Sequence, residues 1–203
     1  MDLSTLQACR VFPVVTATDV ETTVQLARAL QRGGMGAIEI TLRTEAALES
    51  IRAVREAVPG MLVAAGTVTD RKQLDSVLAA GAGLVISPGA TPELLQAAAA
   101  SGADFMPGVA TASELMQGLA QGFTVFKLFP AEAVGGRALL RSFAGPFPEA
   151  RFCPTGGLNP GNFRDYLALP NVICCGGSWM VAADLVDNGK WDEISALARE
   201  AMA

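Results

Sequence analysis

The chain has 203 residues, of which 51% are hydrophobic and only 17% are charged, so most of its elements should be buried in a compact globular protein. Its net charge of −5 and its scattered basic residues exclude a nucleic-acid-binding protein, because contact with the phosphate backbone needs clustered positive charge. No apolar run reaches the ~18 residues of a membrane span. The first ten residues hold no signal-peptide core, so a cytoplasmic protein is expected.

Histidine is absent, which removes the commonest metal ligand and the commonest general base. Acid–base chemistry would therefore fall to carboxylate, lysine, tyrosine or water. The four cysteines, Cys9, Cys153, Cys174 and Cys175, show no C-x-x-C spacing, and an adjacent pair is a poor disulfide. We expect buried, unreactive thiols and neither a metal nor a cofactor.

A short apolar run followed by an amphipathic helical stretch recurs eight times. The predicted strands are residues 11–15, 37–41, 62–67, 84–87, 104–107, 124–129, 151–155 and 171–175, and their first residues lie 20 to 27 positions apart. This spacing is typical of parallel strand–helix units. The intervening helices should begin at the capping residues Asp19, Thr44, Thr69 and Thr91 and end at glycines.

Eight such units without a linker predict a single domain, residues 1–203, folded as a small (β/α)8 barrel. The alternative is a doubly wound open sheet, which would usually carry a glycine-rich turn after its first strand. The segment Val15-Thr16-Ala17-Thr18 follows the first predicted strand and has no glycine. The barrel is therefore favoured.

Lys127 is the first candidate for chemistry. Of the three lysines, Lys72 and Lys190 lie in polar segments, whereas Lys127 stands in an apolar predicted strand. Side-chain alternation turns Phe126 and Leu128 toward the helices and Lys127 into the barrel. Burial disfavours an ammonium, and the neutral amine is the form that attacks a carbonyl. The alternative is a purely structural ion pair with a buried carboxylate.

Glu39 is the one carboxylate flanked on both sides by strand isoleucines, Ile38 and Ile40. Facing the barrel interior, it would pair with Lys127, act as the general base, or do both in turn. Arg43, at the exit of the same strand, suits bidentate binding of a substrate carboxylate or phosphate. The alternative for Arg43 is a surface arginine at the start of the next helix.

Two glycine pairs follow the last two predicted strands, Gly156-Gly157 and Gly176-Gly177, and Ser178 comes directly after the second. In barrels these two turns commonly form a phosphate site from backbone N–H groups and a helix N-terminus. One pair can be no more than a tight turn, but two in succession suggest a phosphorylated ligand. Amine, carboxylate, arginine and phosphate site together indicate carbon–carbon cleavage beside a keto group, through an iminium ion.

Seven segments carry a family resemblance beyond these residues. They are Glu39-Ile-Thr-Leu-Arg-Thr-Glu45, Gly66-Thr-Val68, Ile86-Ser-Pro-Gly89, Lys127-Leu-Phe-Pro-Ala-Glu132, Ala144-Gly-Pro-Phe147, Phe152-Cys-Pro-Thr-Gly-Gly157 and Gly176-Gly-Ser-Trp179. With them the chain resembles, nearly end to end, the bacterial 2-keto-3-deoxy-6-phosphogluconate (KDPG) and 2-keto-4-hydroxyglutarate (KHG) aldolases. It departs at Leu128, where an aromatic residue is common, and at Val134, where asparagine is common; neither position carries the chemistry.

The resemblance implies a (β/α)8 TIM barrel with a short N-terminal helix, assembled as a homotrimer. It also implies a class I aldolase of the Entner–Doudoroff pathway that cleaves KDPG to pyruvate and glyceraldehyde 3-phosphate and acts on KHG as well. Lys127 would form the iminium, and Glu39 would move the protons, through a water. The family pattern further assigns the substrate carboxylate to Arg43 and Thr67, the pyruvyl part to Pro88, Phe129 and Thr155, and the phosphate to Gly156, Gly157, Gly177 and Ser178.

Two other functions stay open from the residues alone. A phosphate-binding barrel isomerase would use Glu39 as base with Lys127 acting only electrostatically, and a phosphosugar-binding barrel would catalyse nothing. The isomerase predicts proton exchange without cleavage, and the binding protein predicts neither. The preference between KDPG and KHG and the stereospecificity at C4 are not readable from the sequence.

Overall fold

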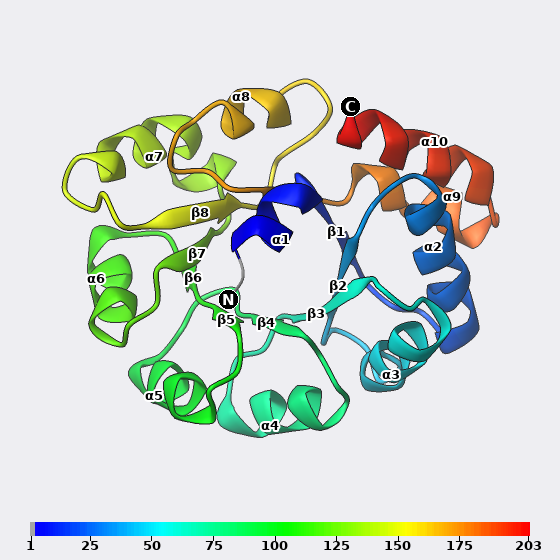
Figure 1. The fold of residues 1–203 in the computed structure, drawn as a ribbon, viewed down its shortest axis with the longest axis horizontal. Helices are drawn as coiled ribbons and strands as arrows, with labels where there is room; N and C mark the ends of the chain where they lie inside the picture. The colour runs from blue at the N-terminus through cyan, green and yellow to red at the C-terminus, as the bar shows by residue number, and fades with distance from the viewer. Residues whose placement is uncertain (1–2) are drawn as a thin grey trace.

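The computed structural model describes residues 3–203, in which helices surround a set of parallel strands (Figure 1). The strands are β1 Val11–Val15, β2 Ala37–Thr41, β3 Leu62–Gly66, β4 Leu84–Ile86, β5 Phe105–Met106, β6 Gly108–Val109, β7 Val125–Leu128, β8 Arg151–Pro154 and β9 Cys175–Gly177. The α-helices are α1 Leu3–Cys9, α2 Val20–Arg32, α3 Ala47–Ala57, α4 Arg71–Ala79, α5 Pro92–Ser101, α6 Ala112–Ala120, α7 Gly136–Ala144, α8 Phe163–Leu167, α9 Ala183–Asp187 and α10 Trp191–Met202. Two 3₁₀ turns, η1 Glu132–Val134 and η2 Trp179–Val181, follow β7 and β9. None of the helices within residues 3–203 is both long and apolar enough to cross a lipid bilayer.

The strands form two sheets, one of six strands in the order β5-β4-β3-β2-β1-β9 and one of three in the order β6-β7-β8. The break between β5 and β6 falls at Pro107, which has no N–H to give to a ladder. Its carbonyl still accepts a 2.9 Å hydrogen bond from the Lys127 N–H. At the other junction, isolated parallel bridges link Phe152 with Val172 and Thr155 with Gly176. The predicted eight-stranded ring is thus not one continuous sheet.

Side chains on the strands alternate between two apolar clusters, as the sequence predicts. Ile38, Ile40, Phe126 and Leu128 belong to the large cluster that includes the buried faces of the helices. The smaller cluster lies among the strands and contains Phe12, Ala37, Ala64, Leu84, Ile86, Met106, Val125, Cys153, Ile173 and Cys174, with Leu6 and Cys9 from α1. Lys127 has the same parity as Val125, so the predicted inward direction of Lys127 is confirmed.

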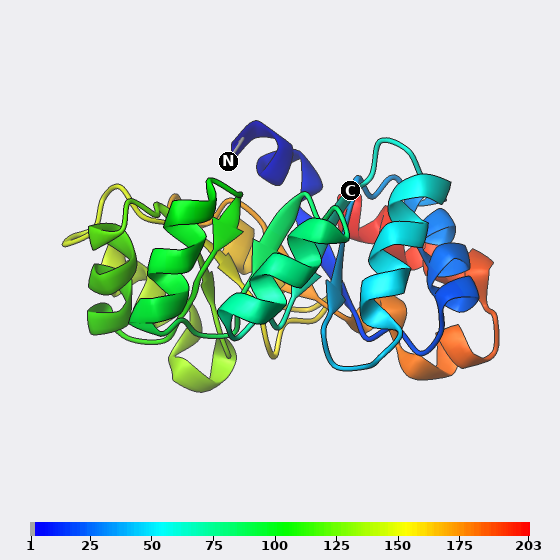
Figure 2. The same cartoon turned by 90° about the horizontal axis from the view of Figure 1, so that it is seen from below.

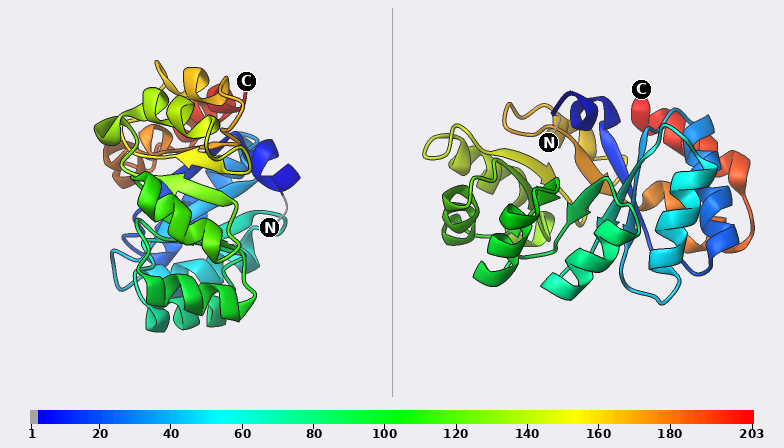
Figure 3. Two further views of the ribbon diagram at one scale, coloured as in Figure 1. Left: turned by 90° about the vertical axis from the view of Figure 1, so that its left-hand side faces the viewer. Right: turned by 60° about the horizontal axis from the view of Figure 1, so that its bottom comes forward.

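The short N-terminal helix α1 lies at the amino ends of the strands, apart from the helices along their sides (Figures 2 and 3). It buries Leu6 and Cys9 against the smaller cluster among the strands, which we call the inner cluster. Because parallel strands all begin at one end, α1 closes that end of the inner cluster. The carboxyl ends of the strands lie at the opposite end, and an active site is expected there.

The eighth strand was predicted at residues 171–175, but the structure places β9 at Cys175–Gly177. β-Branched Val172 and Ile173 suggested a strand, yet residue 172 meets β8 only through an isolated bridge. The glycine pair predicted as a turn is instead part of the strand. A Cβ at Gly176 would overlap Thr155, 2.8 Å from its Cγ2, so a residue without a side chain is required for this close approach.

Two of the four predicted helix caps are confirmed. The Asp19 side chain accepts from the Thr22 N–H, and the Thr91 side chain accepts from the Leu94 N–H. The prediction for Thr44 was wrong, because its hydroxyl donates to the Ala17 carbonyl at 2.6 Å and α3 begins three residues later. The prediction for Thr69 was one residue off, since Asp70 caps α4.

All four cysteines are buried, as predicted, and none forms a disulfide. Burial, and then the neighbouring Cys153, raise the pKa of the Cys9 thiol from 9.0 to about 11. Burial also raises the pKa of Cys175, and a hydrogen bond with Cys153 together with burial raises that of Cys174. Because the thiolate is the reactive form, these thiols should be inert at neutral pH.

We therefore expect no rapid reaction of the native protein with Ellman's reagent at pH 8, and reaction of four thiols after unfolding in guanidinium.

A raised folded-state pKa means that the thiol contributes stability below the unfolded pKa and loses it as pH rises through the folded pKa. For Cys9, the midpoint temperature of unfolding should therefore decrease as the pH is raised from 9 to about 11. A Cys9→Ser variant should lose that part of the pH dependence, and fast native labelling would contradict the account.

Candidate functional site

Lys127 on β7 and Glu39 on β2 meet inside the protein. Nζ donates to Glu39 Oε1 at 2.9 Å, and the two side chains are only 7% and 2% exposed. In the strand register, Lys127 lies beside Gly108 and Cys153, and Glu39 lies beside Val14 and Ala64, so the two side chains meet across the inside of the strands. The two side chains named as chemical candidates thus form one buried hydrogen-bonded ion pair.

Two neighbours of the pair are an aromatic ring and a glycine. Nζ lies 5.4 Å from the ring centroid of Phe129, whose face favours a nearby cation. On the other side, a Cβ at Gly66 would overlap Glu39 Oε1 and lie 2.8 Å from its Cδ. Gly66 was not singled out from the sequence, although a glycine ending a buried strand is a signal of close approach.

Replacing Gly66 with alanine should therefore push the Glu39 carboxylate away from Lys127 while both residues keep their identity. We expect turnover of an iminium-forming substrate to fall by roughly 10²-fold, the usual cost of misplacing a catalytic group by about 1 Å. Gly36→Ala is the matched control, because a Cβ there has nothing within 4 Å. Steady-state kinetics of the two variants make the comparison, and equal turnover would show that Gly66 does not position Glu39.

Thr67 and Pro88 follow β3 and β4, the strands that come after β2 in the sheet. Thr67 has a φ of 63°, a left-handed conformation rare for a threonine. Pro88 packs against Gly108, where a Cβ would overlap its carbonyl, and Gly108 is the neighbour of Lys127 on β6. Both residues therefore lie at the carboxyl ends of strands between those of Glu39 and Lys127.

A pocket of about 160 Å³ opens beside the ion pair at the carboxyl ends of β1, β8 and β9. Its walls are Val14, Arg43, Phe129, Thr155, Gly156, Gly157, Leu158, Gly176, Gly177 and Ser178. Phe129 joins the two parts of the site, because it lines the pocket and also faces the Lys127 amine. The pocket brings seven of the predicted binding residues together but does not include Thr67 or Pro88. Val14 and Leu158 were not singled out as binding residues, and their apolar character left no signal in the sequence. Gly176 belongs to the second glycine pair that the sequence predicted as part of a phosphate site.

The turn after β8 depends on its two glycines. Gly156 and Gly157 have φ angles of 99° and 83°, which residues with side chains rarely adopt. Their carbonyls accept hydrogen bonds from the Glu132 N–H and from the Asn162 side-chain amide, at 3.1 and 3.2 Å. Across the pocket stand Arg43 and the exposed Ser178. An anion in this pocket would meet a guanidinium, a hydroxyl and glycine backbone, which suits a phosphate or a carboxylate.

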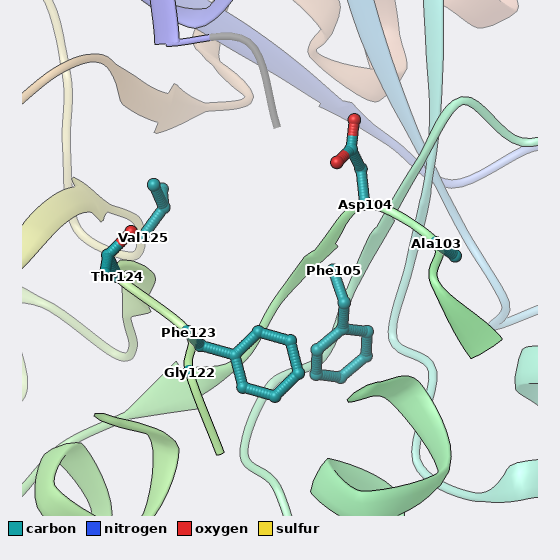
Figure 4. A pocket seen from close by; sticks show the side chains of 7 residues that line it. All are labelled: Ala103, Asp104, Phe105, Gly122, Phe123, Thr124 and Val125. Atoms are coloured by element: carbon teal, nitrogen blue, oxygen red, sulfur yellow. The ribbon is translucent and has the colours of Figure 1, made fainter. Parts of the chain in front are cut away.

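A second pocket, of about 240 Å³, lies at the amino ends of β5 and β7. Figure 4 shows its walls, Ala103, Asp104, Phe105, Gly122, Phe123, Thr124 and Val125. The rings of Phe105 and Phe123 pack at 5.5 Å between centroids. This pocket holds none of the predicted site residues and lies at the end of the strands opposite to the other pocket. We place the candidate site at the carboxyl ends.

Sequence comparison assigns residues 3–197 to the family model described as KDPG and KHG aldolase. The chain is 51% identical over 193 residues to a 2-dehydro-3-deoxy-phosphogluconate aldolase of Pseudoalteromonas atlantica, covering 95% of this chain and 90% of that protein. It is 50% identical over 192 residues to the KHG/KDPG aldolase of Escherichia coli, with the same two coverages.

Solved structures agree with the sequence matches. The KDPG aldolase of Legionella pneumophila, with pyruvate captured at low pH as a covalent carbinolamine, superposes with a TM-score of 0.94 at 44% identity, covering 97% of this chain and 96% of that one. The aldolase of Zymomonas mobilis with 3-phosphoglycerate gives a TM-score of 0.93 at 44% identity, covering 100% and 95%.

Proposed function

Since the chain belongs to the KDPG and KHG aldolase family, we propose that it is a class I aldolase, a carbon–carbon lyase that cleaves KDPG to pyruvate and glyceraldehyde 3-phosphate and also acts on KHG. The observation that carries this proposal is the buried contact of Lys127 with Glu39, beside a pocket suited to anions. A buried amine next to a carboxylate can lose a proton to it and attack a keto group.

The reaction begins when Glu39 accepts a proton from the Lys127 ammonium, across the existing 2.9 Å hydrogen bond. The neutral amine adds to C2 of the substrate. Protonated Glu39 then gives its proton to the departing hydroxyl, so that water leaves the carbinolamine, the iminium forms and Glu39 is again a carboxylate. Glu39, through a water, then removes the C4 hydroxyl proton. The C3–C4 bond breaks, its electrons pass to the iminium to form an enamine, and glyceraldehyde 3-phosphate leaves. Protonation of the enamine at C3 and hydrolysis release pyruvate and restore the amine.

The two anionic ends of the substrate define its direction in the pocket. We assign the phosphate to Gly156, Gly157, Gly177 and Ser178, and the carboxylate to Arg43 and Thr67. The pyruvyl part would then lie against Pro88, Phe129 and Thr155. Phe129 supports the placement of the pyruvyl part, since its ring lies 5.4 Å from the Lys127 amine and also lines the pocket.

We also propose that the two sheets work together as a (β/α)8 barrel. If β5 and β6 are counted as one strand interrupted at Pro107, eight strands follow one another in chain order around the molecule. The Phe152–Val172 and Thr155–Gly176 bridges support contact between β8 and the segment leading into β9. We expect a cytoplasmic protein, as the sequence predicts, and a homotrimer, as the family resemblance implies; light scattering of the purified protein tests the trimer.

Cleavage of KDPG, followed by reduction of the released pyruvate with lactate dehydrogenase, tests the proposed function. The same assay with KHG and with the C4 epimer of KDPG, the galactonate compound, measures specificity. Pyruvate release from KDPG supports the aldolase. Proton exchange from the substrate without pyruvate release would instead identify an isomerase, and neither signal would indicate a binding protein.

A further inference from the structure

A tyrosine and a glutamate behind the pocket form a hydrogen bond that the iminium chemistry does not use. Tyr166 on α8 is fully buried, and its hydroxyl donates to Glu132 Oε1 in η1. Burial, and then the bond to Glu132, raise the pKa of the Tyr166 phenol. The phenol therefore keeps its proton and acts as a fixed donor to the carboxylate.

Glu132 contacts the glycine turn through both its backbone and its side chain. Its N–H donates to the Gly156 carbonyl at 3.1 Å, and a Cβ at Gly157 would lie 2.6 Å from Glu132 Cγ. In the preceding position, the Ala131 N–H donates to the Thr155 carbonyl at 2.8 Å. The loop that follows Lys127 thus lies directly against the turn that we assign to the phosphate.

Tyr166 completes the attachment from the other side of the turn. The chain runs from Gly157 to α8, which carries Tyr166, so the Tyr166–Glu132 bond closes a loop around the turn. Gly136 makes room for this bond, because a Cβ there would overlap the Tyr166 hydroxyl and lie 3.3 Å from Glu132 Oε1. The turn is held between the loop after β7 and the helix α8.

We propose that Glu132 and Tyr166 are positioning residues for the phosphate end of the substrate, holding the Gly156-Gly157 turn where its backbone can bind that group. This inference rests on the proposed function. It goes beyond that function by assigning the selectivity for a phosphorylated substrate to two residues that do not line the pocket. Lys127 and Glu39 bond to each other and not to Glu132 or Tyr166, so their chemistry should proceed without the Tyr166–Glu132 bond.

The test compares KDPG, which carries a phosphate, with KHG, which carries none. In Tyr166→Phe and in Glu132→Ala, KM for KDPG should rise by about tenfold, the scale of one lost hydrogen bond to a charged group. Values of kcat, KM for KHG and the rate of pyruvate trapping by borohydride should stay within about twofold of wild type. Glu132→Gln keeps an acceptor oxygen for Tyr166 and should restore most of the KDPG affinity.

Glu149→Ala is the matched control, since Glu149 is also an exposed glutamate but lies outside the pocket. Glu132 is exposed, so its variants decide the question even if Tyr166→Phe does not fold. An unchanged KM for KDPG in Glu132→Ala would overturn the inference while leaving the aldolase intact, and so would an equal rise for KDPG and KHG. Absence of cleavage by the wild-type protein on either substrate would instead overturn the proposed function, and the inference with it.

Discussion

Replacing Lys127 with alanine is expected to lower KDPG cleavage by roughly 10⁴–10⁶-fold, the scale seen when a catalytic nucleophile is removed. The remaining lysines, Lys72 and Lys190, are exposed, and neither lines the pocket, so no other lysine can take over the attack. Pyruvate release measured with lactate dehydrogenase gives the loss. Lys72→Ala is the matched control and should keep wild-type activity.

Loss of the buried amine also leaves Glu39 without its partner, which can destabilise the fold. Lys127→Arg separates the two effects, because arginine keeps a positive charge beside Glu39 but cannot form an iminium. Both variants should be inactive, and thermal unfolding should show that Lys127→Arg is the more stable of the two. Substantial cleavage by either variant in folded form would mean that Lys127 is not the nucleophile.

Replacing Glu39 with glutamine is expected to lower turnover by about 10²–10⁴-fold, the usual contribution of a general acid–base. Glutamine can still accept a hydrogen bond from Lys127 Nζ, but it cannot take a proton from the C4 hydroxyl. Trapping of pyruvate on Lys127 should therefore persist to some degree while cleavage nearly stops.

The comparison of the two assays in Glu39→Gln distinguishes a base from a structural partner. If Glu39 only held Lys127 in place, a glutamine that holds it equally well would preserve turnover. Wild-type turnover in this variant would show that another group serves as the base. Glu45→Gln, an exposed carboxylate after the same strand, is the control and should behave as wild type.

Strand parity made the central pair predictable. Lys127 between Phe126 and Leu128, and Glu39 between Ile38 and Ile40, had one apolar face each, and that face had to meet the helices. The inward direction of both side chains follows from this pattern. Their mutual 2.9 Å contact does not, because it depends on which strands face each other across the inner cluster.

What the sequence did not show depends on close approaches of the backbone. Gly66 was not singled out as a site residue, and Gly176 was predicted to lie in a turn, but each admits a neighbouring side chain, Glu39 and Thr155 respectively. Pro107 read as the end of a strand, whereas it divides one strand path into β5 and β6. Such features are set by tertiary contacts, which local propensity does not contain.

The binding residues divide in the same way. Arg43 and both glycine pairs, which the residues alone suggested, share a pocket with Phe129 and Thr155, whose roles the family resemblance implied. Thr67 and Pro88 came from the family resemblance, and the structure places them on neighbouring strand ends outside that pocket. Their roles toward the substrate stay predictions.

Borohydride reduction in the presence of pyruvate tests the central claim most directly. If Lys127 forms the iminium, reduction fixes a pyruvyl group on its amine, and peptide mass spectrometry finds that added mass on the peptide containing Lys127 and on neither peptide containing Lys72 or Lys190. The modified protein should lose activity in proportion to the labelling. An unmodified Lys127 peptide, under conditions that inactivate a known Schiff-base aldolase, would contradict the account.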